Sequence, residues 1–320
     1  MCTEGDLSDL GGVGDNLSEV SAEAAFHAAK CLGQLCVQPL DGSPGVDICA
    51  DQLVVSASVV KVPIAIEVEA QLAEGRLDPR GRVMLTAADR SPGPVGFSLY
   101  QDDVDVSIRD LVVAMLTISD NPATDALLQI VGLDAVNERM THLGLTSSVV
   151  VSGEREIVDS IGRDAGLADW KALVEWSRQP RSAAEQEELD RRIYRDSTAL
   201  LPERTTRTTA RDMATLLRLI WTNQAGPAAA CRRVRQLMGQ QLTKHRLASA
   251  FRAPVRVSAK SGGLIGVVRN EIGVVEFPDG RGYAVAVFTQ TPGGAAAGAV
   301  DAEVNRAIGA AAAAAIGALR

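Results

Sequence analysis

Apolar positions along the chain follow two periods, with a two-residue alternation near both ends and a helical spacing between them. Residues 32–40 and 46–55 alternate like strands on either side of the turn Asp41-Gly-Ser-Pro-Gly45. Glycine and proline supply the backbone angles that such a hairpin turn requires. More strands are predicted toward the C-terminal end, where Pro278-Asp-Gly280 forms a tight turn. These later strands are residues 255–259, 267–276 and 282–289.

Helical spacing covers most of the remaining chain, interrupted by a loop over 87–103 that is rich in glycine and proline. The predicted helices are residues 15–30, 59–74, 108–118, 122–130, 134–143, a series within 165–221, one over 231–242, and 297–319. Within the series over 165–221, Thr208 or Thr209 can cap the start of the helix that contains Met213 and Ile220. The tryptophans expected to anchor the core of the helical region are Trp170, Trp176 and Trp221.

This order of elements, with strands at both ends and helices in the middle, predicts an α+β fold. The two ends share one antiparallel sheet flanked by the terminal helices, and the middle forms an all-α lobe. We expect one catalytic domain over 15–320, with the α/β lobe made of 15–57 and 254–320 and the helical lobe of 58–253. Residues 1–14 are expected to be a mobile tail. A ligand is expected in the cleft between the lobes.

Charge and composition exclude several classes of partner. The 320 residues carry a net charge of −8, and no dense basic run is present, so we expect neither a nucleic-acid nor a membrane partner. The longest apolar run, 308–319, is shorter than the ~20 residues that a membrane span needs. The first twenty residues are acidic and lack the positively charged and apolar regions of a signal peptide, so a cytoplasmic location is expected, unless a different start of the chain adds an export signal. A monomer is also expected.

Cysteine and histidine positions indicate no metal site and no cofactor. The five cysteines are an odd number without CxxC spacing, which is typical of reduced thiols. The three histidines are scattered and form no ligand cluster. The cysteines are Cys2, Cys31, Cys36, Cys49 and Cys231, and the histidines are His27, His142 and His245.

Ser58-Val-Val-Lys61 lies where a predicted strand gives way to a helix. Residues three apart in a first helical turn share a face, so the Lys61 amine can reach the Ser58 hydroxyl. A serine hydroxyl needs a neighbouring base to act as a nucleophile, and a desolvated lysine can be that base. Taken alone, this tetrapeptide is more often a capping serine followed by a surface lysine.

Two further polar clusters follow along the chain. Ser119-Asp-Asn121 comes directly after an apolar helix and before Pro122. It is either a turn that ends the helix, or it places the Ser119 hydroxyl in the cleft as a proton relay and the Asn121 amide as a donor to the substrate. Lys260-Ser-Gly262, followed by Gly263, is predicted at the end of a strand. It is either a strand end with a glycine turn, or a charge and a hydroxyl for a substrate carboxylate.

Together and in this order, these clusters resemble the S-x-x-K, S-D-N and K-T-G motifs of class A β-lactamases and penicillin-binding proteins, with serine for threonine in the third. The resemblance covers residues 20 to 318 and implies that family's fold and an acyl-enzyme mechanism without cofactor. By it, Ser58 is the nucleophile, Lys61 its base, and Ser119 the proton relay to the leaving nitrogen. It further implies an oxyanion hole made by the backbone amides of Ser58 and Gly263. The implied substrate-holding residues are Asn121, Lys260 and Ser261.

The match departs from the family in the region before Thr208-Thr-Ala. Class A β-lactamases carry a water-activating glutamate in an E-x-x-L-N pattern there, but Leu189 to Leu201 has none, and counting back leads to Ile193 or Tyr194. The interval from Ser119 to Lys260 is also long, which indicates an insertion. The carboxylates considered as substitutes are Glu188, Asp196 and Glu203, each more often a solvated surface group.

The leading hypothesis is therefore a β-lactamase-like serine hydrolase that opens a β-lactam or a related amide or ester through a Ser58 acyl-enzyme. An alternative is a cytoplasmic esterase, amidase or acyltransferase of a biosynthetic pathway on the same fold. A further alternative, from a different class, is a penicillin-binding protein that is acylated once and does not turn over. The sequence does not decide between hydrolysis and acyl transfer.

Overall fold

The computed structural model describes residues 16–292 and 301–320, with side chains from residue 21 onward. The predicted tail 1–14 and the first residues of the predicted helix 297–319 lie outside this part of the chain. Within the described residues, no helix is both long enough and apolar enough to span a bilayer.

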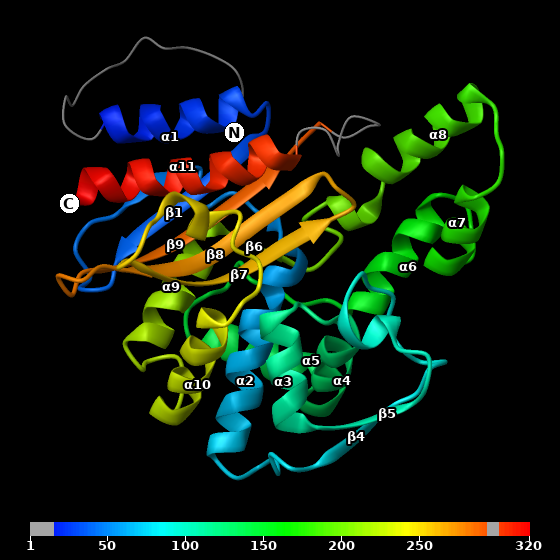
Figure 1. Cartoon of the computed structure of the whole chain (residues 1–320), viewed down its shortest axis with the longest axis horizontal. Helices are drawn as coiled ribbons and strands as arrows, with labels where there is room; N and C mark the ends of the chain where they lie inside the picture. The colour runs from blue at the N-terminus through cyan, green and yellow to red at the C-terminus, as the bar shows by residue number, and fades with distance from the viewer. Residues whose placement is uncertain (1–15, 293–300) are drawn as a thin grey trace.

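A five-stranded antiparallel sheet joins the two ends of the chain, as predicted for an α+β fold (Figure 1). Its strand order is β2-β1-β9-β8-β7, and β1 pairs with β9 along its whole length, from Leu32 opposite Gln290 to Pro39 opposite Tyr283. The edge strand β7 extends to Leu264, beyond the predicted end at residue 259, so Lys260-Ser-Gly262 lies within a strand and not at its end. The strands are β1 (Leu32–Pro39), β2 (Val46–Ile48), β7 (Arg256–Leu264), β8 (Val268–Glu276) and β9 (Gly282–Gln290).

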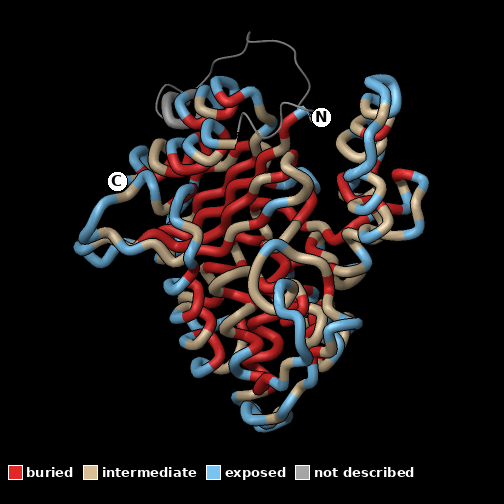
Figure 2. Tube along the Cα trace, turned by 45° about the vertical axis from the view of Figure 1, so that its right-hand side comes forward, coloured by how far each residue is buried: buried red, intermediate tan, exposed pale blue. Residues whose placement is uncertain are grey.

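Both faces of this sheet are buried. Alternate residues of β1 point to opposite sides: Leu35 packs toward the terminal helices α1 (Asn16–Ala28) and α11 (Asp301–Leu319), and Cys36 packs toward α9 (Ala210–Trp221). Figure 1 shows α1 and α11 lying together across one face, and Figure 2 shows the strands as buried stretches between the two layers. Burial on both faces explains the nearly continuous apolar run of β9 in the sequence.

The helical lobe surrounds α2 (Lys61–Ala73), of which almost every residue before the last turn is buried. This helix follows a short 3₁₀ turn, η1 (Ala57–Val60), that carries Ser58. Packing of the lobe against α2 fixes the position of Lys61 in the middle of the molecule. The other helices of the lobe are α3 (Ile108–Thr117), α4 (Asn121–Val131), α5 (Leu133–His142) and α10 (Ala228–Gly239), with a short 3₁₀ turn at η2 (Gly96–Leu99). Two other 3₁₀ turns lie elsewhere: η3 (Thr198–Leu200) packs against α6, and η4 (Leu247–Ala250) packs against α11.

An arm made of α6 (Glu154–Asp164), α7 (Trp170–Ser177) and α8 (Ala183–Tyr194) extends from the body (Figure 1). It has a small core of its own around Ile161 and Leu173. The three tryptophans were expected to anchor the core, but the structure places each of them, only partly buried, at the edge of a hydrophobic cluster. Trp170 and Trp176 pack against the core of the arm, and Trp221 against the main core.

Several sequence-based boundaries differ from the structure. The predicted strand 46–55 is divided, because the backbone turns after β2 and Cys49 has a φ of 44°. Its end forms β3 (Val54–Val55), which pairs with β6 (Arg207–Thr208) away from the main sheet. Two strands that the sequence did not indicate, β4 (Arg82–Leu85) and β5 (Val104–Ser107), pair at the base of the loop 87–103. Thr209 caps α9, accepting a hydrogen bond from the Asp212 amide.

The cysteines are not all reduced thiols. Cys31, Cys36 and Cys231 are free, as expected, whereas Cys49 is disulfide-bonded, so the expectation is wrong for that residue. Burial in the core raises the pKa of the Cys31 thiol to about 11 and that of Cys36 further. These buried thiols are therefore poor nucleophiles at neutral pH.

Candidate active site

Ser58 and Lys61 lie at the junction of η1 and α2, with the Lys61 Nζ 3.0 Å from the Ser58 Oγ. The backbone turns sharply there, because Ala57 has a φ of 46°, an uncommon conformation for a residue with a side chain. Such strain is found where a structure holds a side chain in place for function. Lys61 is fully buried, and Ser58 remains partly exposed. A serine hydroxyl and an adjacent amine are therefore held in hydrogen-bond contact at a surface that a substrate can reach, as nucleophilic catalysis by serine requires.

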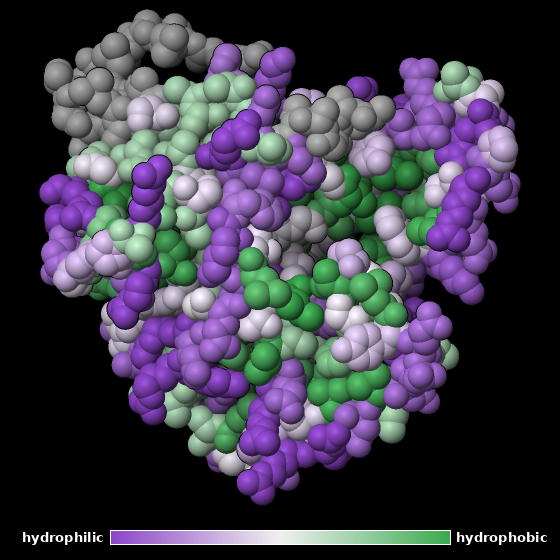
Figure 3. Space-filling view, in the orientation of Figure 1, coloured by the Kyte–Doolittle hydropathy of each residue, from purple (hydrophilic) through white to green (hydrophobic). Residues whose placement is uncertain are grey.

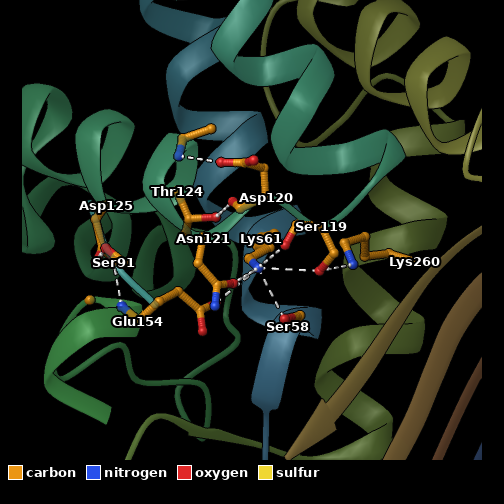
Figure 4. A network of polar contacts seen from close by, with 12 residues as sticks. Ser58, Lys61, Ser91, Ser119, Asp120, Asn121, Thr124, Asp125, Glu154 and Lys260 are labelled. Atoms are coloured by element: carbon orange, nitrogen blue, oxygen red, sulfur yellow. Dashed lines mark hydrogen bonds and ion pairs between the residues drawn. The ribbon is translucent and has the colours of Figure 1, made fainter. Parts of the chain in front are cut away.

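The Lys61 amine connects the Ser58 hydroxyl to three other residues (Figure 4). Its Nζ lies 2.8 Å from the Asn121 Oδ1, 2.8 Å from the Ser119 carbonyl oxygen and 3.2 Å from the Ser119 Oγ. It also forms an ion pair with Glu154, at 3.2 Å from the Oε1. An ammonium has only three protons for these five oxygens, counting that of Ser58. When the amine is neutral, a serine hydroxyl can instead donate to it, as a general base requires.

Ser119 bridges two lysines. The Lys260 Nζ lies 2.9 Å from the Ser119 Oγ, on the opposite side from Lys61, and it also donates to the Ser261 carbonyl oxygen at 2.6 Å. Burial, followed by the nearby charge of Lys61, holds the pKa of Lys260 well below its ordinary value. Two protonated lysines are thus disfavoured around one hydroxyl, and a proton can pass through the Ser119 hydroxyl between them.

The turn that carries Ser119 is fixed by Asp120. Ser119 has a φ of 65°, and Asp120 is fully buried, with its carboxylate accepting hydrogen bonds from the Ala123 amide at 2.8 Å and the Phe97 amide at 2.6 Å. Burial raises the pKa of Asp120, while these hydrogen bonds and Lys61 lower it. Asp120 therefore caps α4 and ties the 91–98 segment to the turn, which leaves its neighbours Ser119 and Asn121 facing the pocket.

The edge strand β7 lies directly against the nucleophile. A Cβ on Gly262 would lie 3.2 Å from the Ser58 nitrogen, so only glycine permits this approach without a shift. The Ser261 N–H points away from β8, because it donates to the Gln241 side chain. Amides two residues apart on a strand point the same way, so the Gly263 N–H also faces outward, beside Ser58. The sequence-based expectation of an oxyanion hole at the amides of Ser58 and Gly263 is compatible with this geometry.

These groups surround a pocket of about 840 Å³ between the lobes. Of the site residues predicted from the sequence, Ser58, Ser119, Asn121, Ser261 and Gly263 line it. Lys61 and Lys260 are fully buried behind these residues, so the structure brings all seven together and places the two amines below the surface of the pocket.

Thr243 and Arg246 are among the residues of the pocket wall that the sequence analysis did not consider. The Arg246 side chain is nearly buried and donates to the carbonyl oxygens of Gly262, at 2.7 Å, and Asn270, at 2.6 Å. Arg246 is the only arginine among the described residues that line this pocket. Its Nε donates to the Asn305 side chain at 2.9 Å, so its charge faces the pocket while most of its donors hold the surrounding chain.

Glu154 is a further functional candidate that the sequence analysis missed. It is the first residue of α6, and Asp125 fixes that helix end: the Glu154 amide donates to Asp125 at 2.6 Å, the Arg155 amide donates at 3.0 Å, and the Ser91 hydroxyl donates to the same carboxylate. Burial raises the pKa of Asp125, and these hydrogen bonds lower it. The capped helix start holds the Glu154 carboxylate beside Lys61 and at the pocket wall.

The sequence analysis counted back from Thr208 by the family's spacing and did not reach Glu154, because most of the arm is inserted between these two residues. Ile193 and Tyr194, where the count ended, are on α8. The signal was present as Glu154-Arg-Glu-Ile157, which keeps the glutamate and an apolar residue three positions later, although Val158 stands where the family pattern has asparagine.

The carboxylates considered as substitutes do not line this pocket. Glu188 is an exposed residue of α8 in ion pairs with Arg191 and Arg192, which lower its pKa to about 2. Asp196 is paired with Arg191 on the same exposed surface, and Glu203 is exposed. Within the described residues, no group of three or more His, Cys, Asp and Glu side chains could hold a metal ion.

Comparisons with known proteins agree with this geometry. Residues 17–319 match the model of the Beta-lactamase enzyme family. The chain is 28% identical over 285 residues to the "Beta-lactamase regulatory protein BlaB" of Streptomyces cacaoi, covering 83% of this chain and 87% of the relative.

Solved structures share the fold over most of the chain. A β-lactamase from Sphaerobacter thermophilus is 25% identical with a TM-score of 0.71, covering 93% of this chain and 97% of that one. A mutant of PBP-A, in an acyl-enzyme complex with penicillin G, is 19% identical with a TM-score of 0.69, covering 92% and 95%. The fold and the site together define a serine enzyme of the β-lactamase and penicillin-binding type. Because the family match spans residues 17–319, the chain belongs to the Beta-lactamase enzyme family.

Proposed function

We propose that this protein hydrolyses a β-lactam, or a related amide or ester, through an acyl-enzyme on Ser58. The observation that carries the proposal is the position of the Lys61 amine, within 3.2 Å of oxygens of Ser58, Ser119 and Glu154 at once. A single amine can then exchange protons with the nucleophile, the relay to the leaving group and the base for water.

In the acylation step, neutral Lys61 takes the Ser58 proton as the Ser58 Oγ attacks the substrate carbonyl carbon. The negative charge that develops on the carbonyl oxygen is stabilised by the amides of Ser58 and Gly263. The C–N bond breaks as the leaving nitrogen receives the Ser119 hydroxyl proton, which the amine of Lys61 replaces. Asn121 and Ser261 orient the substrate, and Arg246 adds a charge for its carboxylate, with Lys260 behind Ser119.

In the deacylation step, Glu154 removes a proton from a water that attacks the ester carbonyl carbon. The Ser58 Oγ and the Glu154 Oε1 lie 3.0 Å and 3.2 Å from the same nitrogen, so they are separated by at most about 6.2 Å. A water with two hydrogen bonds of about 2.8 Å spans nearly that distance. The ester C–O bond breaks, the proton returns to Ser58, and the free enzyme is restored.

A second candidate is a penicillin-binding sensor that is acylated and turns over slowly. Two observations favour it: the relative from Streptomyces cacaoi is a regulatory protein by its name, and Val158 lies at the pocket wall one helical turn after Glu154. A valine cannot hydrogen-bond the attacking water, so only Glu154 would orient it.

The test is the loss of benzylpenicillin ring absorbance over time, with the wild type and Ser58→Ala compared at equal concentration. The hydrolase proposal predicts many turnovers per wild-type molecule and none for Ser58→Ala. A single equivalent consumed by the wild type, with no further loss, favours the sensor. Turnover that begins only when an amine or alcohol acceptor is added supports the acyltransferase alternative. Equal turnover by Ser58→Ala would refute the proposal.

A further inference from the structure

The pocket changes character along the edge strand β7. Near Ser261 its wall is polar, with Thr243 and Arg246 close by. Beyond Gly263 it is lined by an apolar wall. At about 3.3 Å per residue, Ser261 and Leu264 lie about 10 Å apart, with the nucleophile opposite Gly262 between them. The apolar wall consists of Val158, Trp170, Leu264 and Ile265.

Trp170 reaches this wall from the arm, and its position is closely defined. Its backbone N–H donates to Asp159 at 3.1 Å, and the preceding Asp169 caps α7 by accepting from the Ala172 amide at 2.7 Å. A Cβ on Gly162 would lie 2.2 Å from the Asp169 backbone, so this glycine allows α7 to approach α6 closely. The half-buried indole is thereby anchored at the pocket.

Ile265 contributes to the same wall at a conformational cost. It begins the β7–β8 turn, where Ile265 has a φ of 39° and Gly266 a φ of 79°. Turns with positive φ at both central residues prefer asparagine, aspartate or glycine, and a β-branched residue is strained there. The side chain packs against the core of the arm and lines the pocket, which is a reason to keep isoleucine at this position.

These independent observations carry one inference, which rests on the proposed acyl-enzyme function. We propose that the arm and the β7–β8 turn form a subsite selecting substrates with a large apolar acyl substituent, aromatic or branched aliphatic. With the substrate carboxylate at the polar end and the scissile bond at Ser58, the substituent extends along β7 into the apolar wall. Figure 3 shows hydrophobic surface gathered on the side of the arm that faces the body.

The experiment compares two β-lactams that differ only in this substituent: benzylpenicillin, which carries a phenylacetyl group, and 6-aminopenicillanic acid, which has none. The second-order rate constant of acylation is measured for each by intact-protein mass spectrometry. We expect the wild type to prefer benzylpenicillin at least tenfold. Trp170→Ala should lower the benzylpenicillin constant about tenfold and leave that of 6-aminopenicillanic acid unchanged, because only the first substrate contacts the indole.

Trp176→Ala is the matched control. Trp176 lies on the same helix and packs against the same core, but it does not line the pocket, so the preference should remain. Ile265→Asn tests the wall from the β7–β8 turn instead of from α7. Asparagine suits the positive φ of the turn, which offsets the lost contact with the core of the arm, so the melting temperature should change little, yet the preference should decrease.

The outcomes separate this inference from the proposed function. A decrease of both acylation constants by the same factor in Trp170→Ala and Ile265→Asn, or no decrease in either, overturns the subsite. A wild type that reacts with both β-lactams without preference overturns it as well. If the wild type reacts with neither, the proposed function itself fails, and the subsite fails with it.

Discussion

Replacing Glu154 by glutamine tests the assignment of the base for water. The glutamine keeps the size and the hydrogen-bonding shape of the side chain but cannot take a proton. Glu154 contacts Lys61, but the 3.0 Å contact of Lys61 with Ser58 is made without it, so acylation should persist and should slow far less than deacylation. Deacylation should slow about 10²- to 10⁴-fold, the usual contribution of a general base.

The assay mixes the enzyme with benzylpenicillin, removes free substrate, and follows the decay of the adduct mass. Glu156→Gln is the matched control, since this glutamate lies on the same helix turn but is exposed and paired with Arg163. The variant at 154 should accumulate the adduct while the control behaves like the wild type. If the Glu154→Gln adduct decays at the wild-type rate, the reasoning is refuted and another group activates the water.

Three further predictions concern the groups around the site and the core. Asp125→Ala removes the acceptor of the Glu154 amide, so it should lower the free energy of unfolding by about 1–2 kcal/mol in urea titrations. It should also slow deacylation more than acylation, and equal slowing of both steps would contradict this positioning role. Gly262→Ala places a Cβ 3.2 Å from the Ser58 nitrogen, so acylation should fall about 10²- to 10³-fold while circular dichroism stays unchanged; wild-type acylation would show that the approach of β7 is not needed. Burial raises the pKa of Glu69 from 4.5 to about 7, so this carboxyl favours the folded state when protonated, and its contribution is lost as the pH rises through 7. Glu69→Gln should therefore be more stable than the wild type at pH 8, by at most about 3 kcal/mol, with the difference vanishing below about pH 4.5 in denaturant titrations at several pH values; a difference that does not change with pH would contradict the assignment.

The elements that the sequence predicted well are those with a strong and continuous apolar pattern. The strands predicted over 32–40, 267–276 and 282–289, the long helices and the contact of Ser58 with Lys61 all follow from local spacing, and the structure confirms them. Spacing of three residues in a helical turn is a local constraint, so no knowledge of the rest of the chain is needed to place these two side chains together.

The features that the sequence did not reveal depend on contacts between distant segments. The strand over 46–55 is divided because Val54 and Val55 pair with β6, some 150 residues later, and no local pattern encodes that partner. Glu154 was missed because α6 has few apolar residues and depends on Asp125 for its cap, and because the arm displaces the count from Thr208. The burial of Lys260 behind Ser119 likewise follows from the meeting of the two lobes.

The most direct test of the central claim is the site of covalent attachment. The wild type is mixed with benzylpenicillin, quenched in acid within seconds, digested, and its peptides sequenced by mass spectrometry. The account predicts one penicilloyl group, located on Ser58, and no adduct on Ser58→Ala protein treated in the same way. A penicilloyl group on another residue, or one that still forms on Ser58→Ala, would contradict the account.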